Sequence, residues 1–138
     1  MKILIAEDDL ASRKLMHKYL SSYGDCDIAQ DGNVAIEAFQ CALDNNEPYD
    51  LVCLDIMMPN IDGRKALKKI RQIEDEHGIG GFDNVKVIMT TALSDSENIM
   101  GSFREGCEAY LIKPVEKNKL LQEMSNLGLI KLAKKSDS

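Results

Sequence analysis

The chain lacks tryptophan, contains only three prolines and carries fewer basic than acidic residues. It has 17 lysines and arginines against 23 aspartates and glutamates, which gives a formal net charge of −6 at pH 7. Proteins that bind nucleic acid directly need clustered positive charge, so this balance disfavours such a partner. No apolar run approaches the roughly 20 residues that cross a bilayer, and the N-terminus has no signal-peptide pattern. We therefore expect a cytoplasmic protein without membrane contact.

The four cysteines show no CxxC pair and no other spacing typical of a metal site. Cys53 lies within an apolar run and Cys107 follows a glycine, so we expect both to be small core or near-core residues. Neither His17 nor His77 has a second ligand at metal-binding spacing. The sequence thus predicts a reduced protein whose cysteines bind no metal.

Short apolar runs alternate with stretches of helical spacing, in a chain whose length of 138 residues fits one domain. This alternation is typical of a parallel sheet that is covered by helices. The five predicted strands are Ile3–Ala6, Asp27–Ala29, Leu51–Leu54, Val85–Met89 and Ala109–Ile112. We expect residues 1–130 to form this α/β domain and residues 131–138 to form a polar, frayed tail.

Helical spacing predicts five helices, around residues 15–20, 34–42, 66–73, 99–103 and 118–127. In the fourth of them, the apolar residues Ile99, Met100 and Phe103 share one face. The stretch from Glu74 to Asn84 contains three glycines and several charges, so we expect a long surface loop there. A loose connection without a binding role (slack in the chain) is a simpler explanation of this loop than a surface that binds a partner.

Charged side chains directly follow three of the apolar runs. Glu7, Asp8 and Asp9 come after the first strand, Asp55 after the third and Lys113 after the fifth. Burying an unpaired charge is costly, so we expect these groups to meet at one solvent-accessible edge of the sheet. Open α/β folds place their sites at this edge, at the carboxyl ends of the strands. Several acids that face one lysine predict a magnesium and phosphate site.

Two other interpretations of these residues deserve comparison. Carboxylates at strand ends can simply cap the following helices, where the helix dipole favours negative charge, but capping leaves Lys113 and Thr91 unexplained. A flavodoxin-like cofactor-binding protein or a small α/β hydrolase would need further motifs. No glycine-rich phosphate loop follows the first strand and no Gly-x-Ser-x-Gly turn is present, so both are disfavoured.

Together these motifs resemble the receiver domain of two-component response regulators, over roughly residues 1 to 128. Each motif alone is weak, but the ordered set is specific: Glu7-Asp8, Asp55 with Met58-Pro59 and Asp62-Gly63 behind it, Thr91-Ala92, and Lys113-Pro114. The resemblance implies a doubly wound, flavodoxin-like parallel sheet of five strands in the order 2-1-3-4-5, with five helices. It also assigns the acidic pair to Glu7 and Asp8, which leaves Asp9 for helix capping.

The resemblance implies that Asp55 is the phosphoacceptor, a nucleophile that takes a phosphoryl group as an acyl phosphate. The implied cofactor is Mg²⁺, a hard cation that binds oxygen ligands and keeps several waters. Asp8 and Asp55 are its expected carboxylate ligands, with Glu7 on metal-bound water and the Met57 backbone carbonyl completing the set.

The resemblance also assigns the residues that recognise the phosphoryl group. Lys113 is expected to pair with one phosphoryl oxygen and Thr91 to hydrogen-bond another, while Pro114 fixes the turn after the lysine. Tyr110 occupies the position of the aromatic side chain that moves inward when members of the family are phosphorylated. We expect the surface from the fourth to the fifth helix, roughly Ser94 to Leu127, to respond.

The implied function is a phosphoacceptor signalling switch of a two-component phosphorelay, not an enzyme with an external substrate. Its expected partners are a sensor histidine kinase or phosphotransfer protein, which donates the phosphoryl group, and a downstream protein target. Receivers often pair through the fourth-helix to fifth-helix face, so a phosphorylation-dependent homodimer is compatible with the resemblance. A degenerate receiver that serves only as a binding module is disfavoured by the presence of Asp55, Thr91 and Lys113.

Overall fold

The central strands are apolar on both faces because helices cover both sides of the sheet. The computed structural model describes residues 1–132 and contains five parallel strands in the order β2-β1-β3-β4-β5. These are β1 (Lys2–Ala6), β2 (Asp25–Ala29), β3 (Leu51–Leu54), β4 (Lys86–Thr91) and β5 (Ala109–Ile112). The predicted doubly wound sheet and its strand order are therefore confirmed.

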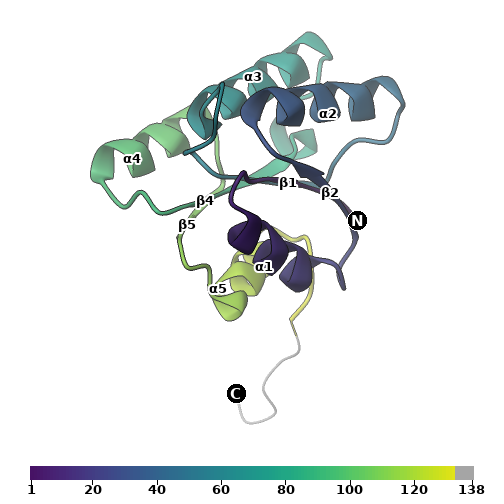
Figure 1. Ribbon diagram of the computed structural model, residues 1–138. Helices are drawn as coiled ribbons and strands as arrows, with labels where there is room; N and C mark the ends of the chain where they lie inside the picture. Colours follow the sequence, from purple (N-terminus) through teal and green to yellow (C-terminus); the bar gives the residue numbers. More distant parts are fainter. Residues whose placement is uncertain (133–138) are drawn as a thin grey trace.

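Five α-helices and one short 3₁₀-helix connect or follow these strands within the described residues. They are α1 (Leu10–Leu20), α2 (Gly32–Asp44), α3 (Gly63–Glu76), η1 (Gly81–Asp83), α4 (Ser96–Glu105) and α5 (Lys117–Asn126). As Figure 1 shows, α1 and α5 lie on one face of the sheet, whereas α2, α3 and α4 lie on the other. Each face has its own apolar core. Across residues 1–132, no helix is long and apolar enough to span a bilayer.

Aspartate side chains begin four of the helices. Each accepts a hydrogen bond from the backbone N–H three residues ahead, and the four caps are Asp9 for α1, Asp31 for α2, Asp62 for α3 and Asp95 for α4. Such caps satisfy amide groups that lack a partner within the first helical turn. The predicted capping role of Asp9 is confirmed.

The apolar face predicted for the fourth helix does not point into the core. Met100 and Phe103 are 60% and 46% exposed, and the buried positions of α4 are Gly101 and Ser102. Apolar spacing locates a helix but does not establish which side packs against the sheet. At Gly101 a side chain from α3 occupies the space that a Cβ atom would fill.

The connection between α3 and β4 is also more ordered than the sequence indicates. Glu74 was expected to begin a surface loop, but it belongs to α3 and is only 2% exposed. Its carboxylate accepts hydrogen bonds from Arg71 Nη1 and from the Val85 amide, both at 2.7 Å. One buried side chain therefore joins the two ends of the connection, so the loop prediction is wrong for Glu74. The middle of the segment does lie on the surface, where Phe82 is 97% exposed.

Arg71 extends the same network to the turn before β5. Its guanidinium donates to the carbonyl oxygens of Val85, at 2.8 Å, and of Gly106, at 2.6 Å from Nη2. It also forms an ion pair with Glu108 at 2.9 Å. The Glu108 carboxylate in turn accepts from the Val87 amide. Arg71 thus connects α3, β4 and β5 at the end of the sheet where these strands begin.

The C-terminal boundary of the domain stays a prediction. α5 ends at Asn126 and residues up to 132 follow it, but the rest of the tail predicted for residues 131–138 lies outside the described residues.

Candidate functional site

Three of the predicted site residues lie one position beyond a strand, and their backbones continue the hydrogen bonding of the sheet. The Glu7 amide donates to the Ala29 carbonyl at 2.9 Å, and the Asp55 amide donates to the Ala6 carbonyl at 3.1 Å. The Lys113 amide donates to the Thr91 carbonyl at 2.8 Å. Because the strands are parallel and in register, these bonds fix all three residues at one edge of the sheet.

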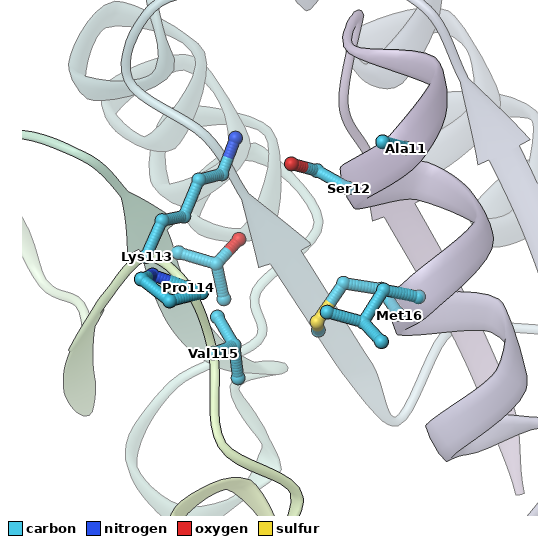
Figure 2. Close-up of a pocket in the computed structure, with 8 residues that line it drawn as sticks. Ala11, Ser12, Met16, Lys113, Pro114 and Val115 are labelled. Carbon is cyan, nitrogen blue, oxygen red and sulfur yellow. The ribbon is translucent and has the colours of Figure 1, made fainter.

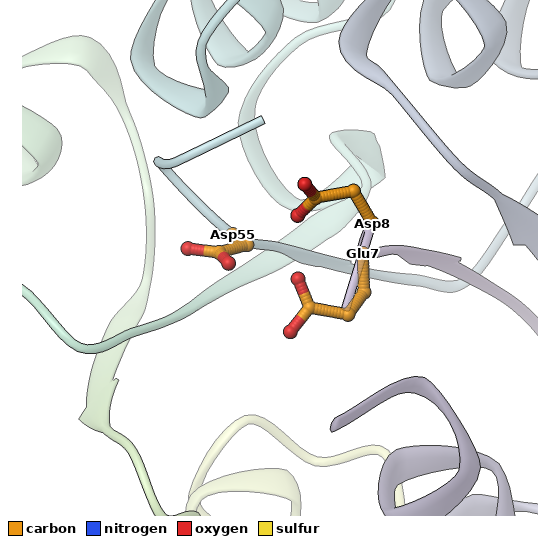
Figure 3. A group of neighbouring side chains, drawn as sticks. All are labelled: Glu7, Asp8 and Asp55. Atoms are coloured by element: carbon orange, nitrogen blue, oxygen red, sulfur yellow. The ribbon is translucent and has the colours of Figure 1, made fainter. Parts of the chain in front are cut away.

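The side chains of these residues form one charged cluster. Lys113 Nζ donates to Glu7 Oε1 and to Asp55 Oδ2, the latter at 2.8 Å. Glu7, Asp8 and Asp55 each place a carboxylate oxygen within 4.8 Å of the others, and Figure 3 shows these carboxylates converging above the ends of β1 and β3. Glu7 and Asp55 are buried, whereas Asp8 is exposed. The three carboxylates could hold a metal ion that reaches the site from solvent.

The pKa of Glu7 is raised to about 7, mainly by burial. The neighbouring Asp55 also raises this pKa, and its effect is larger than the opposite effect of Lys113. Burial also opposes the charge on Lys113, but hydrogen bonds to Asp55 and Glu7 outweigh this effect and raise the lysine pKa. Glu7 Oε2 is buried without a hydrogen-bond partner. A cation or a water bound to one would satisfy this oxygen, so the residues present fit a metal site.

The raised pKa of Glu7 makes the stability of the metal-free protein depend on pH. An unfolded glutamate ionises near pH 4.5, whereas folded Glu7 ionises near pH 7, so the folded state binds more protons between these values. The free energy of unfolding should therefore fall as pH rises through this window, by about 3 kcal/mol from this group. Urea titrations with chelator from pH 4.5 to pH 8, compared between the unmodified chain and Glu7→Gln, isolate this contribution. Parallel curves for the two proteins would contradict it.

The remaining predicted residues lie beside this cluster. Thr91 is fully buried and its Oγ1 accepts from the Leu93 amide at 3.3 Å, while Tyr110 donates its hydroxyl to the Leu93 carbonyl at 2.7 Å. Both side chains therefore contact the turn between β4 and α4. The Met57 amide donates to Asp55 Oδ1 at 3.1 Å, and the Lys113–Pro114 peptide bond is cis.

A mostly apolar hollow of about 210 Å³ lies beside Lys113, between α1 and the chain that follows β5. Figure 2 shows the Lys113 ammonium and the Ser12 hydroxyl at the same end of this hollow, with Met16 and Val115 deeper inside. Thr90, which the sequence does not distinguish from other strand residues, also lines it. The sequence does not indicate this hollow, because apolar spacing does not reveal where a helix and a neighbouring loop leave a gap.

Arg13 is a further residue that sequence reasoning missed. Its Nη1 lies 3.4 Å from the Glu7 carbonyl oxygen and 3.5 Å from that of Asp8. This places a cation from the first turn of α1 against the backbone of the acidic pair. The only sequence signal is a position shortly after Asp9, which does not separate Arg13 from the other basic residues of α1.

The profile of the response regulator receiver domain family matches residues 3–125. The chain belongs to this family. Receiver domains are signalling modules and not enzymes, and the acidic cluster of Glu7, Asp8 and Asp55 is typical of the receiver Mg²⁺ site. The match includes every described element except the first residue of β1 and the last residue of α5, which agrees with the ordered motifs in the sequence.

Relatives and solved structures give the same assignment. This receiver is 28% identical over 128 residues to the chemotaxis protein CheY of Treponema pallidum. The alignment covers 91% of this chain and 81% of that protein. It is similar to a chain in the CheX–CheY–BeF₃–Mg²⁺ complex of Borrelia burgdorferi, with a TM-score of 0.79, 28% identity and coverage of 95% and 90%. A co-crystal of the Saccharomyces cerevisiae phosphotransfer protein Ypd1 with the Ssk1 receiver domain matches with a TM-score of 0.79, 25% identity and coverage of 93% and 88%. In five other curated relatives, the receiver spans between 8% and 55% of the relative's length.

Proposed function

We propose that this receiver is a phosphoacceptor switch of a two-component phosphorelay and that Asp55 is the residue phosphorylated. The observation that carries the proposal is the buried Asp55 carboxylate, which contacts Lys113 on one oxygen and lies within reach of Glu7 and Asp8. A carboxylate that only caps a helix needs neither the lysine nor the second buried acid. This arrangement instead suits an incoming group that carries several negative charges.

The reaction is a transfer between two nucleophiles. An Asp55 carboxylate oxygen forms a bond to phosphorus as the bond from phosphorus to a donor histidine nitrogen breaks. That nitrogen keeps the bonding electron pair and the product on Asp55 is an acyl phosphate. Catalysis of such transfers depends mainly on positioning and on neutralising the charge of the transferred group. Lys113 would move its ammonium from the carboxylate to a phosphoryl oxygen, and Thr91 would donate its hydroxyl to another.

Mg²⁺ would be held by Asp8, Asp55 and the Met57 backbone carbonyl, with Glu7 on a metal-bound water. When bound, the ion neutralises negative charge on the carboxylates and the transferred group. The raised pKa of Glu7 supports this assignment, because burial and the neighbouring Asp55 both favour protonation and a bound cation would oppose both effects. Pro114 would fix the turn that presents Lys113.

The switch would operate through the turn between β4 and α4. Thr91 and Tyr110 both contact Leu93 in this turn, from β4 and from β5. A phosphoryl group that draws the Thr91 hydroxyl toward Asp55 would release the Leu93 amide and change the site that holds the Tyr110 hydroxyl. The surface of α4, β5 and α5 would then change its affinity for a downstream protein or for a second copy of the chain.

The phosphoryl donor would be the phosphohistidine of a sensor histidine kinase or of a phosphotransfer protein, with the reaction in the cytoplasm. The solved Ypd1 complex supports the second type of donor, since it pairs a phosphotransfer protein with a receiver of the same fold. The Borrelia burgdorferi complex supports the cofactor, because it combines a similar receiver with Mg²⁺ and BeF₃.

The proposal is tested by measuring intact mass after incubation with acetyl phosphate and Mg²⁺. We expect a single phosphoryl adduct on the unmodified chain, because the proposal assigns one phosphoacceptor, Asp55. The adduct should disappear when Mg²⁺ is chelated and in Asp55→Ala. A matched control is Asp83→Ala, which removes an exposed carboxylate in η1 and should leave the adduct unchanged. A folded chain that forms no adduct would instead be a docking module that works without phosphorylation.

A further inference from the structure

Arg64 follows the turn that carries the phosphoacceptor candidate. It is the second residue of α3, directly after Gly63, and the Gly63 amide donates to the Ile56 carbonyl at 2.9 Å. A Cβ atom on Gly63 would lie only 2.1 Å from the backbone oxygen of Asp55, so the start of α3 packs directly against the Asp55 backbone. The turn after Asp55 and the start of α3 that carries Arg64 are therefore in direct backbone contact.

The Arg64 side chain leaves α3 and lies along α4. Its Nε and Nη2 each donate to a different carboxylate oxygen of Glu105, both at 3.2 Å, in a two-pronged ion pair at the C-terminal end of α4. Its Nη1 lies 3.4 Å from Asn98 Oδ1 in the first turn and 3.7 Å from a carboxylate oxygen of Glu97. The guanidinium thus contacts both ends of the helix.

Gly101 provides the space that this contact requires. A Cβ atom at this position would lie 2.0 Å from Arg64 Nη2, so the guanidinium occupies the volume that any other residue would fill. Glycine in the middle of a helix is destabilising relative to alanine, and the φ angle of Gly101 does not call for it. Close approach of Arg64 is therefore the physical reason that glycine suits this position.

The Arg64 contact also continues to the turn that holds the switch residues. Asn98 donates its side-chain amide to Asp95 at 2.9 Å, and Asp95 caps α4 by accepting from the Asn98 backbone. Asp95 lies two residues after Leu93, which both Thr91 and Tyr110 contact. Two sets of contacts therefore connect the end of β3 and β4 with α4. One passes through the β4–α4 turn, and the other passes through Arg64 of α3.

We infer that Arg64 is a positioning residue that couples the turn after Asp55 to α4, so that a change at the phosphoacceptor site shifts α4 through α3. The inference rests on the proposed function of Asp55 and adds a second connection to the one through Thr91 and Tyr110. An arginine suits this role because its planar fork fixes orientation as well as charge, which a lysine does not.

Two substitutions interrupt this contact in different ways. Arg64→Met keeps most of the aliphatic side chain but removes the guanidinium. Gly101→Ala leaves Arg64 in the chain but fills its place with a methyl group, and displacing the flexible end of an arginine keeps the fold intact. Arg104→Met is the matched control, because Arg104 is an exposed arginine of α4 whose one described ion pair, at 3.7 Å, is with Glu97.

The experiment combines intact mass with amide NMR shifts before and after saturation with acetyl phosphate and Mg²⁺. We expect all three variants to form the adduct as the unmodified chain does. In Arg64→Met and Gly101→Ala, the shift changes of residues 96–105 on phosphorylation should fall at least about twofold, while those near Thr91 persist. Arg104→Met should respond like the unmodified chain. If the α4 amides of Arg64→Met respond to phosphorylation as strongly as those of the unmodified chain, the coupling alone is overturned. If the unmodified chain forms no adduct, the proposed function and the coupling are overturned together.

Discussion

Replacing Arg71 with methionine is expected to lower the free energy of unfolding by about 3–5 kcal/mol. The substitution leaves the Glu74 carboxylate, 2% exposed, without the cation that contacts it at 2.7 Å. It also removes the donors to the Val85 and Gly106 carbonyl oxygens. Removing one partner of a buried ion pair is more costly than the pair is stabilising, because the remaining charge is neither solvated nor neutralised. Urea unfolding at pH 7 measures the loss.

Lys69→Met is the matched control for this prediction, since Lys69 is an exposed cation of the same helix. It should change the free energy of unfolding by less than about 0.5 kcal/mol. The double variant Arg71→Met with Glu74→Leu should recover part of the stability, because no unpaired charge then remains at position 74. Equal stability of Arg71→Met and Lys69→Met would show that the network contributes nothing.

Replacing Lys113 with methionine is expected to destabilise the metal-free protein by about 3 kcal/mol at pH 8. Lys113 is the cation between two buried carboxylates, those of Glu7 and Asp55, which would otherwise face one another. Protonation of Glu7 relieves this repulsion, so the loss should be smaller at pH 5.5 than at pH 8. Added Mg²⁺ should restore more stability to this variant than to the unmodified chain, because the ion supplies the missing positive charge. Thermal unfolding with and without Mg²⁺ at the two pH values checks each effect.

Lys119→Met serves as the control for Lys113→Met. The Lys119 side chain is 69% exposed and its ammonium lies 4.0 Å from a Glu116 carboxylate oxygen, so its removal should have little effect at either pH. A Lys113→Met protein that loses no stability at pH 8, or that gains no more from Mg²⁺ than the control, would show that Lys113 does not balance the charges of Glu7 and Asp55.

The sequence predicts the edge of the sheet that carries the site because strand and charge signals coincide there. Glu7, Asp55 and Lys113 each end an apolar run, and a parallel sheet brings the ends of such runs together. Parallel pairing of the strands is sufficient to bring these three positions, which are far apart in the chain, into one cluster. The alternation of elements predicts the five strands and five helices, whereas the strand order came from the family resemblance alone.

Helix orientation and buried charge could not be predicted in the same way. The apolar residues Met100 and Phe103 point outward because Gly101 and Ser102 pack inward, and helical spacing fits either side. Glu74 was placed in a surface loop because three glycines and several charges follow it in the chain. Its burial depends on its contacts with Arg71 and Val85, which no sequence pattern indicates. Which charges pair in the interior depends on the three-dimensional arrangement and leaves no periodic signal.

The ion network of Arg71 and the cluster of Glu7, Asp55 and Lys113 lie at opposite ends of the sheet. A change in the sequence beside the first is therefore remote from the second. Glu74 fixes both ends of the α3–β4 connection, while Phe82 at its centre is 97% exposed and Gly80 has no neighbouring atom within 4 Å of an added Cβ. The segment between residues 78 and 83 is therefore a suitable place to graft a peptide epitope or a fluorescent dye. A receiver labelled there would report its encounters with other proteins and would leave the proposed phosphorylation at Asp55 undisturbed.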